Sequence, residues 1–260
     1  ADQNFTTATD SYNTAVGAFA GTAVTTGIQN TIIGGLAGDA LTDADHNAAM
    51  GYQALSADTL GSYAVAIGTG ALRTQNFTTA TNTYNTAVGA QAGLSITTGK
   101  HNTLMGGLSA DALTVGTDNV AIGTGALGKD TQGSKTVAVG REALFTQNFT
   151  TATDSHNTAI GHQAGLYVTT GIHNTLVGAL AGDALTDADY NVAVGYGSLT
   201  ADTLGSRSVA VGINTLSTQN FTTATATYNT AVGYDAGNDV TTGRYNTFIG
   251  GLAGDRTTTG

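Results

Sequence analysis

The stretch Asn13-Thr-Ala-Val-Gly17 decides the fold, because close copies of it return at short, regular intervals down the whole chain. The copies start at Asn13, Asn30, Asn47, Ala64, Asn85, Asn102, Asn119, Thr136, Asn157, Asn174, Asn191, Ser208, Asn229 and Asn246. Successive starts lie 17, 17, 17 and 21 residues apart, and the cycle repeats every 72 residues. So short a period is typical of a solenoid in which each repeat forms one coil. The sequence therefore predicts an all-β parallel β-solenoid of about fourteen coils.

The coils group into super-repeats that cover 13–84, 85–156 and 157–228, with partial super-repeats at 1–12 and 229–260. We expect one continuous solenoid segment over residues 1–260. Solenoids need polar caps at their ends, and both ends of this sequence match the middle of a coil instead. We therefore expect the sequence to be a segment of a longer chain.

Composition and motifs argue against several classes of function. The formal charge is −10, from 18 acidic and 8 basic residues, which argues against binding of nucleic acid or an anionic membrane through charge. No apolar run approaches the roughly 20 residues that span a bilayer, so we expect no direct membrane insertion in this segment. Cysteine is absent, and every loop is periodic, without a nucleophile motif or a phosphate loop. We expect a protein that is not an enzyme and has no cofactor.

Glycine occupies position 5 of every coil, counted from the coil start. Glycine is favoured where φ is positive or where two backbones approach closely. We therefore expect a corner of the coil at each of these structural glycines. They are Gly17, Gly34, Gly51, Gly68, Gly89, Gly106 and Gly123 in the first seven coils, with equivalents from Gly140 to Gly250 in the other seven.

Positions 3 and 4 are both apolar, although neighbouring residues of a strand point to opposite faces. Position 4 is always Val, Ile or Met, and we expect it to fill the coil interior against the small residue at position 8. Position 3 is Ala in ten coils and Ile32, Leu104, Leu176 or Phe248 in the others. We interpret position 3 as a face that packs on another chain; the alternative is alanine tolerated on a solvated face.

Copies such as Ser208-Val-Ala-Val-Gly212 and Asn119-Val-Ala-Ile-Gly123 resemble the head repeats of trimeric autotransporter adhesins. The longer form Asn-Thr-Ala-Val-Gly-x-x-Ala, with Thr-Thr-Gly before the next Asn, is similar to repeats of phage tail fibres and related surface fibres. The resemblance implies a left-handed parallel β-roll with three chains side by side. It also implies an extracellular structural or adhesive fibre segment, on a cell surface or a virion, that attaches to a surface receptor such as a glycan. The alternative from another class is a solenoid module that binds Ca²⁺ or ice.

Clustered acids are the weak candidates for a metal site. Asp39, Asp43 and Asp45 recur as Asp183, Asp187 and Asp189. Carboxylates can bind Ca²⁺, but the middle super-repeat replaces two of these acids by Val115 and Thr117. A solvated turn is the favoured interpretation, because Asp also bonds its own backbone in turns.

Rows of aromatic and Thr residues raise two further hypotheses. His46, His101, His156 and His173 directly precede a coil start, and Tyr takes that place in six other coils. A metal ladder needs His in adjacent coils, so a stacked aromatic rim is favoured. Ice binding needs regular Thr ranks, and the pair Thr25-Thr26 returns only every fourth coil, which argues against an ice plane.

The 21-residue coils carry four extra residues in the stretches Thr74 to Thr81, Thr146 to Thr153 and Thr218 to Thr225, with a partial copy from Gln3 to Thr9. We expect these stretches to protrude as equivalent loops, which are often the binding face of a solenoid. Their aromatic residues, Phe5, Phe77, Phe149 and Phe221, are either exposed contacts or anchors onto a neighbouring chain. Regularly spaced exposed aromatics promote aggregation, which favours the anchor.

Each of these stretches also contains an Asn-Phe-Thr glycosylation sequon, at Asn4, Asn76, Asn148 and Asn220. Sugars at these sites would decorate one edge at regular intervals. A polar loop whose Phe packs down on a neighbour is the favoured alternative, because no eukaryotic secretory signal is visible in the sequence.

Overall fold

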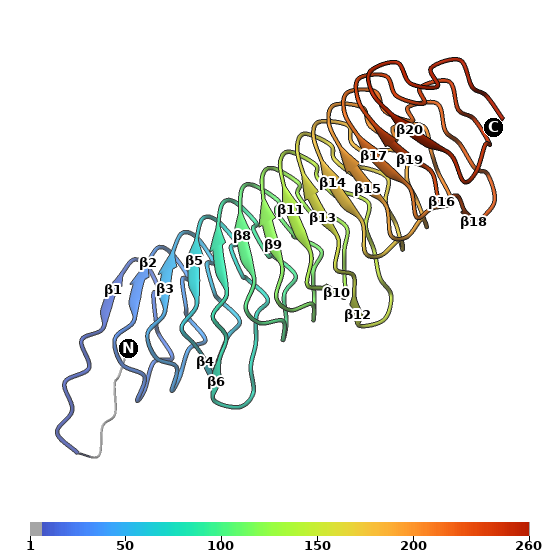
Figure 1. Cartoon of the computed structure of the whole chain (residues 1–260). Coiled ribbons are helices and arrows are strands. Elements are labelled where there is room, and N and C mark those ends of the chain that lie inside the picture. The colour runs from blue at the N-terminus through green and yellow to red at the C-terminus, as the bar shows by residue number, and fades with distance from the viewer. Residues whose placement is uncertain (1–6, 260) are drawn as a thin grey trace. The chain divides into compact units, whose positions relative to one another are not determined.

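The structure is a computed structural model that describes residues 7–259. The chain divides into two compact units, Ala1–Gly125 with Thr131–Gly133, and Ala126–Asp130 with Ser134–Gly260. Each unit is a parallel β-solenoid whose coils stack side by side (Figure 1). The described residues form about fourteen turns and contain no helix, which confirms the predicted fold class.

The first unit is built on a row of seven three-residue strands. In sheet order they are β1 (Thr14–Val16), β2 (Thr31–Ile33), β3 (Ala48–Met50), β5 (Val65–Ile67), β7 (Thr86–Val88), β8 (Thr103–Met105) and β9 (Val120–Ile122). The unit also holds a two-stranded sheet of β4 (Gly61–Ser62) and β6 (Thr81–Asn82). Each long-sheet strand begins one residue after a coil start, so the repeat phrase itself forms the sheet.

The second unit repeats this plan. Its long-sheet strands are β11 (Val137–Val139), β13 (Thr158–Ile160), β14 (Thr175–Val177), β15 (Val192–Val194), β17 (Val209–Val211), β19 (Thr230–Val232) and β20 (Thr247–Ile249). Its short strands are β12 (Thr153–Asp154), β16 (Gly205–Ser206) and β18 (Thr225–Ala226). The short strand β10 (Gly133–Ser134) has one residue in each unit.

Strand register follows the repeat. Neighbouring strands pair residues 17 positions apart, as Thr14 pairs with Thr31. At β5–β7, β11–β13 and β17–β19 the offset is 21, as between Val65 and Thr86. All of these pairs are parallel, so the chain enters the sheet in the same direction in each coil.

The glycine at position 5 turns the corner after each strand, as expected. Its φ is strongly positive, +142° at Gly89 for example, in a region open almost only to glycine. A Cβ on Gly89 would also lie 2.4 Å from the carbonyl oxygen of Gly106 in the next coil. Both physical reasons for glycine therefore act at the same residue.

The facing of positions 3 and 4 is the reverse of our expectation. Position 3 is buried, as at Ala66, Leu104 and Ala193, whereas position 4 points outward, as at Met50 and Ile67. The asparagine at position 1 explains this result, because it is buried in most coils and sets the alternation of the strand: 1 in, 2 out, 3 in, 4 out. Position 3 is therefore not a face for another chain.

The four extra residues of a 21-residue coil leave the path of the turn, as expected (Figure 1). Asn76 still lies against Thr59, 17 residues earlier, but β4 and β6 pair Gly61 with Thr81, 20 residues apart. The full offset of 21 is reached where Thr83 meets Ser62. Between these points Thr78, Thr79 and Ala80 are exposed, and the same exposure recurs at 150–152 and 222–224.

Candidate functional site

The exposed apolar side chains of each unit gather on one stretch of the coil, from position 0 (the residue before the coil start) to position 7. We call the outward side chains of this stretch the apolar face, which covers the strand and continues round the glycine corner to positions 6 and 7. In the described chain, 22 large hydrophobic side chains are exposed, and all but Val115 and Tyr167 belong to it. The strand contributes branched residues at position 4, such as Ile67 and Ile160, which are 37% and 41% exposed. A parallel sheet with an apolar outer face is usually covered.

An aromatic row lies at position 0 along one border of this face. In the first unit His46, Tyr63, Tyr84 and His101 stack with ring centroids 4.6, 5.3 and 5.8 Å apart. This stack confirms the predicted aromatic rim. Because each ring covers the face of the next, the row presents ring edges rather than ring faces to a partner.

The second unit continues the pattern with a cation in the row. His156, His173 and Tyr190 stack at 5.1 and 4.9 Å, and Tyr228 stacks on Tyr245 at 5.5 Å. The guanidinium of Arg207 takes the place between Tyr190 and Tyr228, 5.3 and 5.8 Å from their rings. A cation over an aromatic face is a favourable pair, so Arg207 continues the stack.

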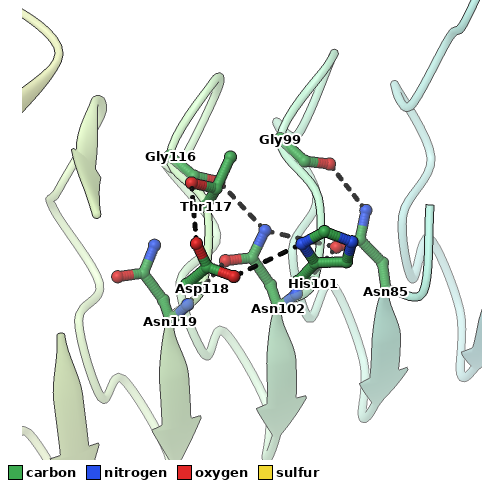
Figure 2. Close-up of polar contacts among 8 residues, drawn as sticks. All are labelled: Asn85, Gly99, His101, Asn102, Gly116, Thr117, Asp118 and Asn119. Carbon is green, nitrogen blue, oxygen red and sulfur yellow. Dashed lines mark hydrogen bonds and ion pairs between the residues drawn. The ribbon is translucent and has the colours of Figure 1, made fainter. Parts of the chain in front are cut away.

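An asparagine ladder runs beneath the aromatic row, and its role was not visible in the sequence analysis. Figure 2 shows three of its members, Asn85, Asn102 and Asn119, on successive strands. The Nδ2 of Asn102 donates to the carbonyl of Gly116 at 3.0 Å, within its own coil. Its Oδ1 accepts the backbone N–H of Asn119 in the next coil at 3.1 Å. Each asparagine therefore closes its own coil and bonds the following one.

The ladder is interrupted once in each super-repeat, where the coil start is Ala64, Thr136 or Ser208. A buried aspartate and glutamine lie there at position 12, the interior position that holds Leu41 or Leu113 in other coils. Gln75 Nε2 donates to Asp58 Oδ2 at 2.6 Å, and Gln75 Oε1 accepts from Asn85 Nδ2 at 2.8 Å. The interruption is thus bridged by an Asp–Gln–Asn chain.

Equivalent chains occur twice in the second unit. Gln147 joins Asp130 to Asn157 at 2.6 and 2.9 Å, and Gln219 joins Asp202 to Asn229 at 2.5 and 2.7 Å. Burial raises the pKa of Asp202, and hydrogen bonds from Gln219 and backbone N–H groups oppose that rise. The recurrence of Asp at 58, 130 and 202, and of Gln at 75, 147 and 219, was the sequence signal for these chains.

The acidic turns make bonds to the neighbouring coil. Asp43 accepts from the Thr26 hydroxyl at 2.5 Å, and Asp45 accepts the N–H of Ile28 at 2.8 Å. Their equivalents Asp187 and Asp189 do the same with Thr170 and Ile172. Among residues 7–259 no group of three or more acidic or His side chains is placed to hold a metal ion. The calcium interpretation of these turns therefore gains no support.

The third acid of each turn is half-buried. Asp183 accepts from the Thr200 hydroxyl at 2.5 Å, and burial raises the pKa of Asp183. Asp39 is its equivalent, with Ser56 in place of Thr200, and its Oδ1 atom is buried without a hydrogen-bond partner. These contacts fit the favoured interpretation of the acids as turn residues.

The aromatic residues of the extra stretches are buried in their own chain. Phe77, Phe149 and Phe221 are 7%, 5% and 7% exposed. An exposed contact is therefore wrong for these three, and little ring surface remains for an anchor onto another chain. The alternative was a polar loop whose Phe packs down on a neighbour, and the structure shows each of these rings buried within its own chain. Asn76, Asn148 and Asn220 are exposed beside them, whereas Phe5 and Asn4 lie outside the described residues.

Comparisons with protein-family models, with curated proteins and with solved structures found no match for this chain. Among the described residues, no helix has the length and apolarity to cross a membrane.

Proposed function

We propose that this chain is a non-enzymatic segment of an extracellular fibre, on a cell surface or a virion, that assembles as a homotrimer and mediates attachment to a surface. The apolar face of each unit is the observation that carries the proposal. Net charge would keep free chains apart, yet 20 of the 22 exposed large hydrophobic side chains of residues 7–259 lie on the apolar faces of the two units. Burial of such a face against copies of the chain is the simplest way to remove it from water.

The proposed form is a left-handed roll with coils of 17, 17, 17 and 21 residues. The strand offsets of 17 and 21 support these lengths, and the resemblance of the repeats to adhesin heads and tail fibres supports the handedness and the trimer. In this proposal the trimer packs through position 4 and its neighbours, not through position 3. The receptor is a surface molecule, with glycans as one class to test.

Two matched variants test the assembly. Ile67 on the apolar face and Val115 on another side of the coil are 37% and 38% exposed in the same unit. Light scattering should give the mass of three chains for the wild type and for Val115→Glu. Ile67→Glu should shift the protein towards single chains, because it brings a charge into a desolvated contact. A monomeric wild type, or equal effects of the two variants, would contradict the proposal.

Attachment is tested separately with a surface-binding assay. Particles coated with the wild-type protein should bind cells or glycan surfaces that uncoated particles do not bind. If the trimer forms but no surface is bound, the chain is a spacer rather than an adhesive segment.

An ice-binding module is a second candidate, because one observation favours it. Position 13 holds Thr in three successive coils and Asn in the fourth, so a hydroxyl rank does exist. Thr25, Thr42 and Thr59 are one such rank in the first unit. Their hydroxyls donate to oxygens of the residues at position 13 of the next coil, at 3.3, 3.0 and 3.1 Å. An ice-recrystallisation assay tests this candidate, and calorimetry with Ca²⁺ tests the calcium module in the same way. A clear signal in either assay would displace the fibre proposal as the full account.

A further inference from the structure

Each extra stretch of the 21-residue coils ends in a loop next to a buried carboxylate. We define the inserted loops as Phe77–Thr81, Phe149–Thr153 and Phe221–Thr225. We infer that Asp58, Asp130 and Asp202 hold these loops in one fixed position, and that each can do so only as an acceptor on both carboxylate oxygens. The inserted loops are then ordered parts of the solenoid, not mobile protrusions.

The first step is the contact between carboxylate and loop. Asp202 is fully buried, and its Oδ1 accepts the N–H of Gly205 and of Phe221, each at 3.0 Å. Gly205 opens β16, against which the loop returns, and Phe221 is the first residue of the loop. Asp202 Oδ1 therefore links the first residue of the loop to the preceding coil. Asp58 makes the same pair of bonds with Gly61 and Phe77 at 3.0 and 3.1 Å.

The second step is the direction of the hydrogen bonds. Asn229 Nδ2 donates to the carbonyl of Gly243 at 2.7 Å, and its Oδ1 accepts the N–H of Asn246 at 2.9 Å. A backbone carbonyl only accepts and a backbone N–H only donates, so these two bonds fix the orientation of the Asn229 amide. Nδ2 of Asn229 also donates to Gln219 Oε1. Gln219 must therefore turn its Nε2 group towards Asp202 Oδ2, where the distance is 2.5 Å.

Donors thus reach both oxygens of Asp202. Asparagine has the same shape, but one of its two terminal atoms is an NH₂ group. In Asp202→Asn this group would face either the two backbone N–H groups or the Gln219 amide. Flipping Gln219 would only move the conflict to Asn229, whose orientation is fixed. An unpaired buried polar group is costly, so the carboxylate is specifically required.

Deuterium exchange measured by mass spectrometry on Asp202→Asn tests the inference, since the molecule carries its own control. The loop Phe221–Thr225 should exchange about tenfold to a hundredfold faster than in the wild type, the factor expected for losing a hydrogen bond to a charged group. The loop Phe149–Thr153, which keeps Asp130, should exchange as in the wild type. Equal exchange of the two loops, or no change in either, would overturn the inference.

A second variant covers the case in which Asp202→Asn does not fold. Asp202→Leu with Gln219→Leu gives both coils the apolar interior that Leu41 and Leu113 provide elsewhere. This double variant should remain folded, with the exchange of Phe221–Thr225 raised and that of Phe149–Thr153 unchanged. Wild-type exchange in the first loop would show that the carboxylate does not hold it. Unfolding of both variants would also contradict the inference, which confines the effect to one loop.

Discussion

Single glycines decide whether neighbouring coils can approach. Gly89 combines a φ of +142° with a backbone oxygen 2.4 Å from the site of a Cβ. This oxygen belongs to Gly106, which directly follows β8 and donates its N–H to the carbonyl of Val88 at 2.8 Å, so it cannot move alone. The nearby Gly107 has its closest neighbour at 3.9 Å and no positive φ. Alanine already occupies the equivalent position at Ala18, Ala90 and Ala179.

We expect Gly89→Ala to lower the free energy of unfolding by more than about 3 kcal/mol, from backbone strain and overpacking together. Gly107→Ala should change it by no more than about 1 kcal/mol, with a small gain from the less flexible unfolded chain. Urea unfolding followed by circular dichroism measures both variants. Similar losses for the two would show that close approach of the backbones is not the reason for glycine.

One buried hydroxyl is unpaired, which gives a stabilising variant. Ser109 is fully buried, its Oγ has no hydrogen-bond partner, and alanine fills the equivalent place at Ala37 and Ala181. Ser109→Ala should raise the free energy of unfolding by about 1 kcal/mol, since it removes an unsatisfied polar group. Ser198 is buried to the same extent but donates to the carbonyl of Gly195 at 3.1 Å. Ser198→Ala should bring no comparable gain, and a loss on Ser109→Ala would refute the argument.

At the scale of the strand and its coil, the asparagine ladder replaces contacts that a narrow core cannot supply. Asn102 is fully buried and makes bonds to Asn85, Gly116 and Asn119. Asn102→Ala leaves the Gly116 carbonyl and the Asn119 N–H without these partners. We expect a loss of about 2–4 kcal/mol, because two buried backbone groups lose their bonds. Asn82→Ala is the control, since Asn82 is exposed, and it should stay within about 0.5 kcal/mol of wild type in thermal unfolding.

The comparison of sequence and structure also belongs at this scale. The spacing of the repeat phrase was sufficient to predict the coils, the corner at Gly89 and its equivalents, and the stack that includes Tyr63 and Tyr84. The prediction of which strand residue points into the coil was wrong. Positions 3 and 4 are both apolar, so hydrophobicity alone does not distinguish the inner from the outer residue. The deciding residue was Asn at position 1, a polar residue whose burial depends on backbone partners in the same coil and in the next.

The buried network shows a second limit of the sequence. Asp58 and Gln75 look like loop residues, because a charged and a polar residue at an interior position break the expected pattern. Their 72-residue recurrence was visible, but their pairing depends on a contact between side chains 17 residues apart in neighbouring coils. The interpretation of Phe77 as an exposed contact was wrong for a related reason, since the burial of Phe77 depends on where the inserted residues leave the coil.

For the molecule as a whole, acidity should increase stability over part of the acidic range. Burial raises the pKa of Asp111 and Asp183, so the folded state holds these protons more tightly than the unfolded chain. The stability that they contribute is present at low pH and is lost as pH rises above about 4 through their folded pKa values. Their carboxyl groups therefore favour the folded state more at about pH 4 than at pH 7.

Two acids at the surface, the half-exposed Glu142 and the exposed Asp154, act in the opposite direction. A hydrogen bond from Gln163 lowers the pKa of Glu142, and one from Lys135 lowers the pKa of Asp154. Their stabilisation is present above the unfolded pKa and is lost as pH falls through the folded pKa. Exposed pairs of this kind are weak and are screened by salt. The half-buried acids should therefore dominate, and protonation also relieves the self-repulsion of a chain with a net charge of −10.

We accordingly expect the urea midpoint of unfolding to rise between pH 7 and about pH 4. Asp183→Asn should reduce the rise, because the Thr200 hydroxyl still finds an acceptor in the amide while the titration is removed. A midpoint that falls between pH 7 and about pH 4 in the wild type would show that the ion pairs at the surface outweigh the half-buried acids.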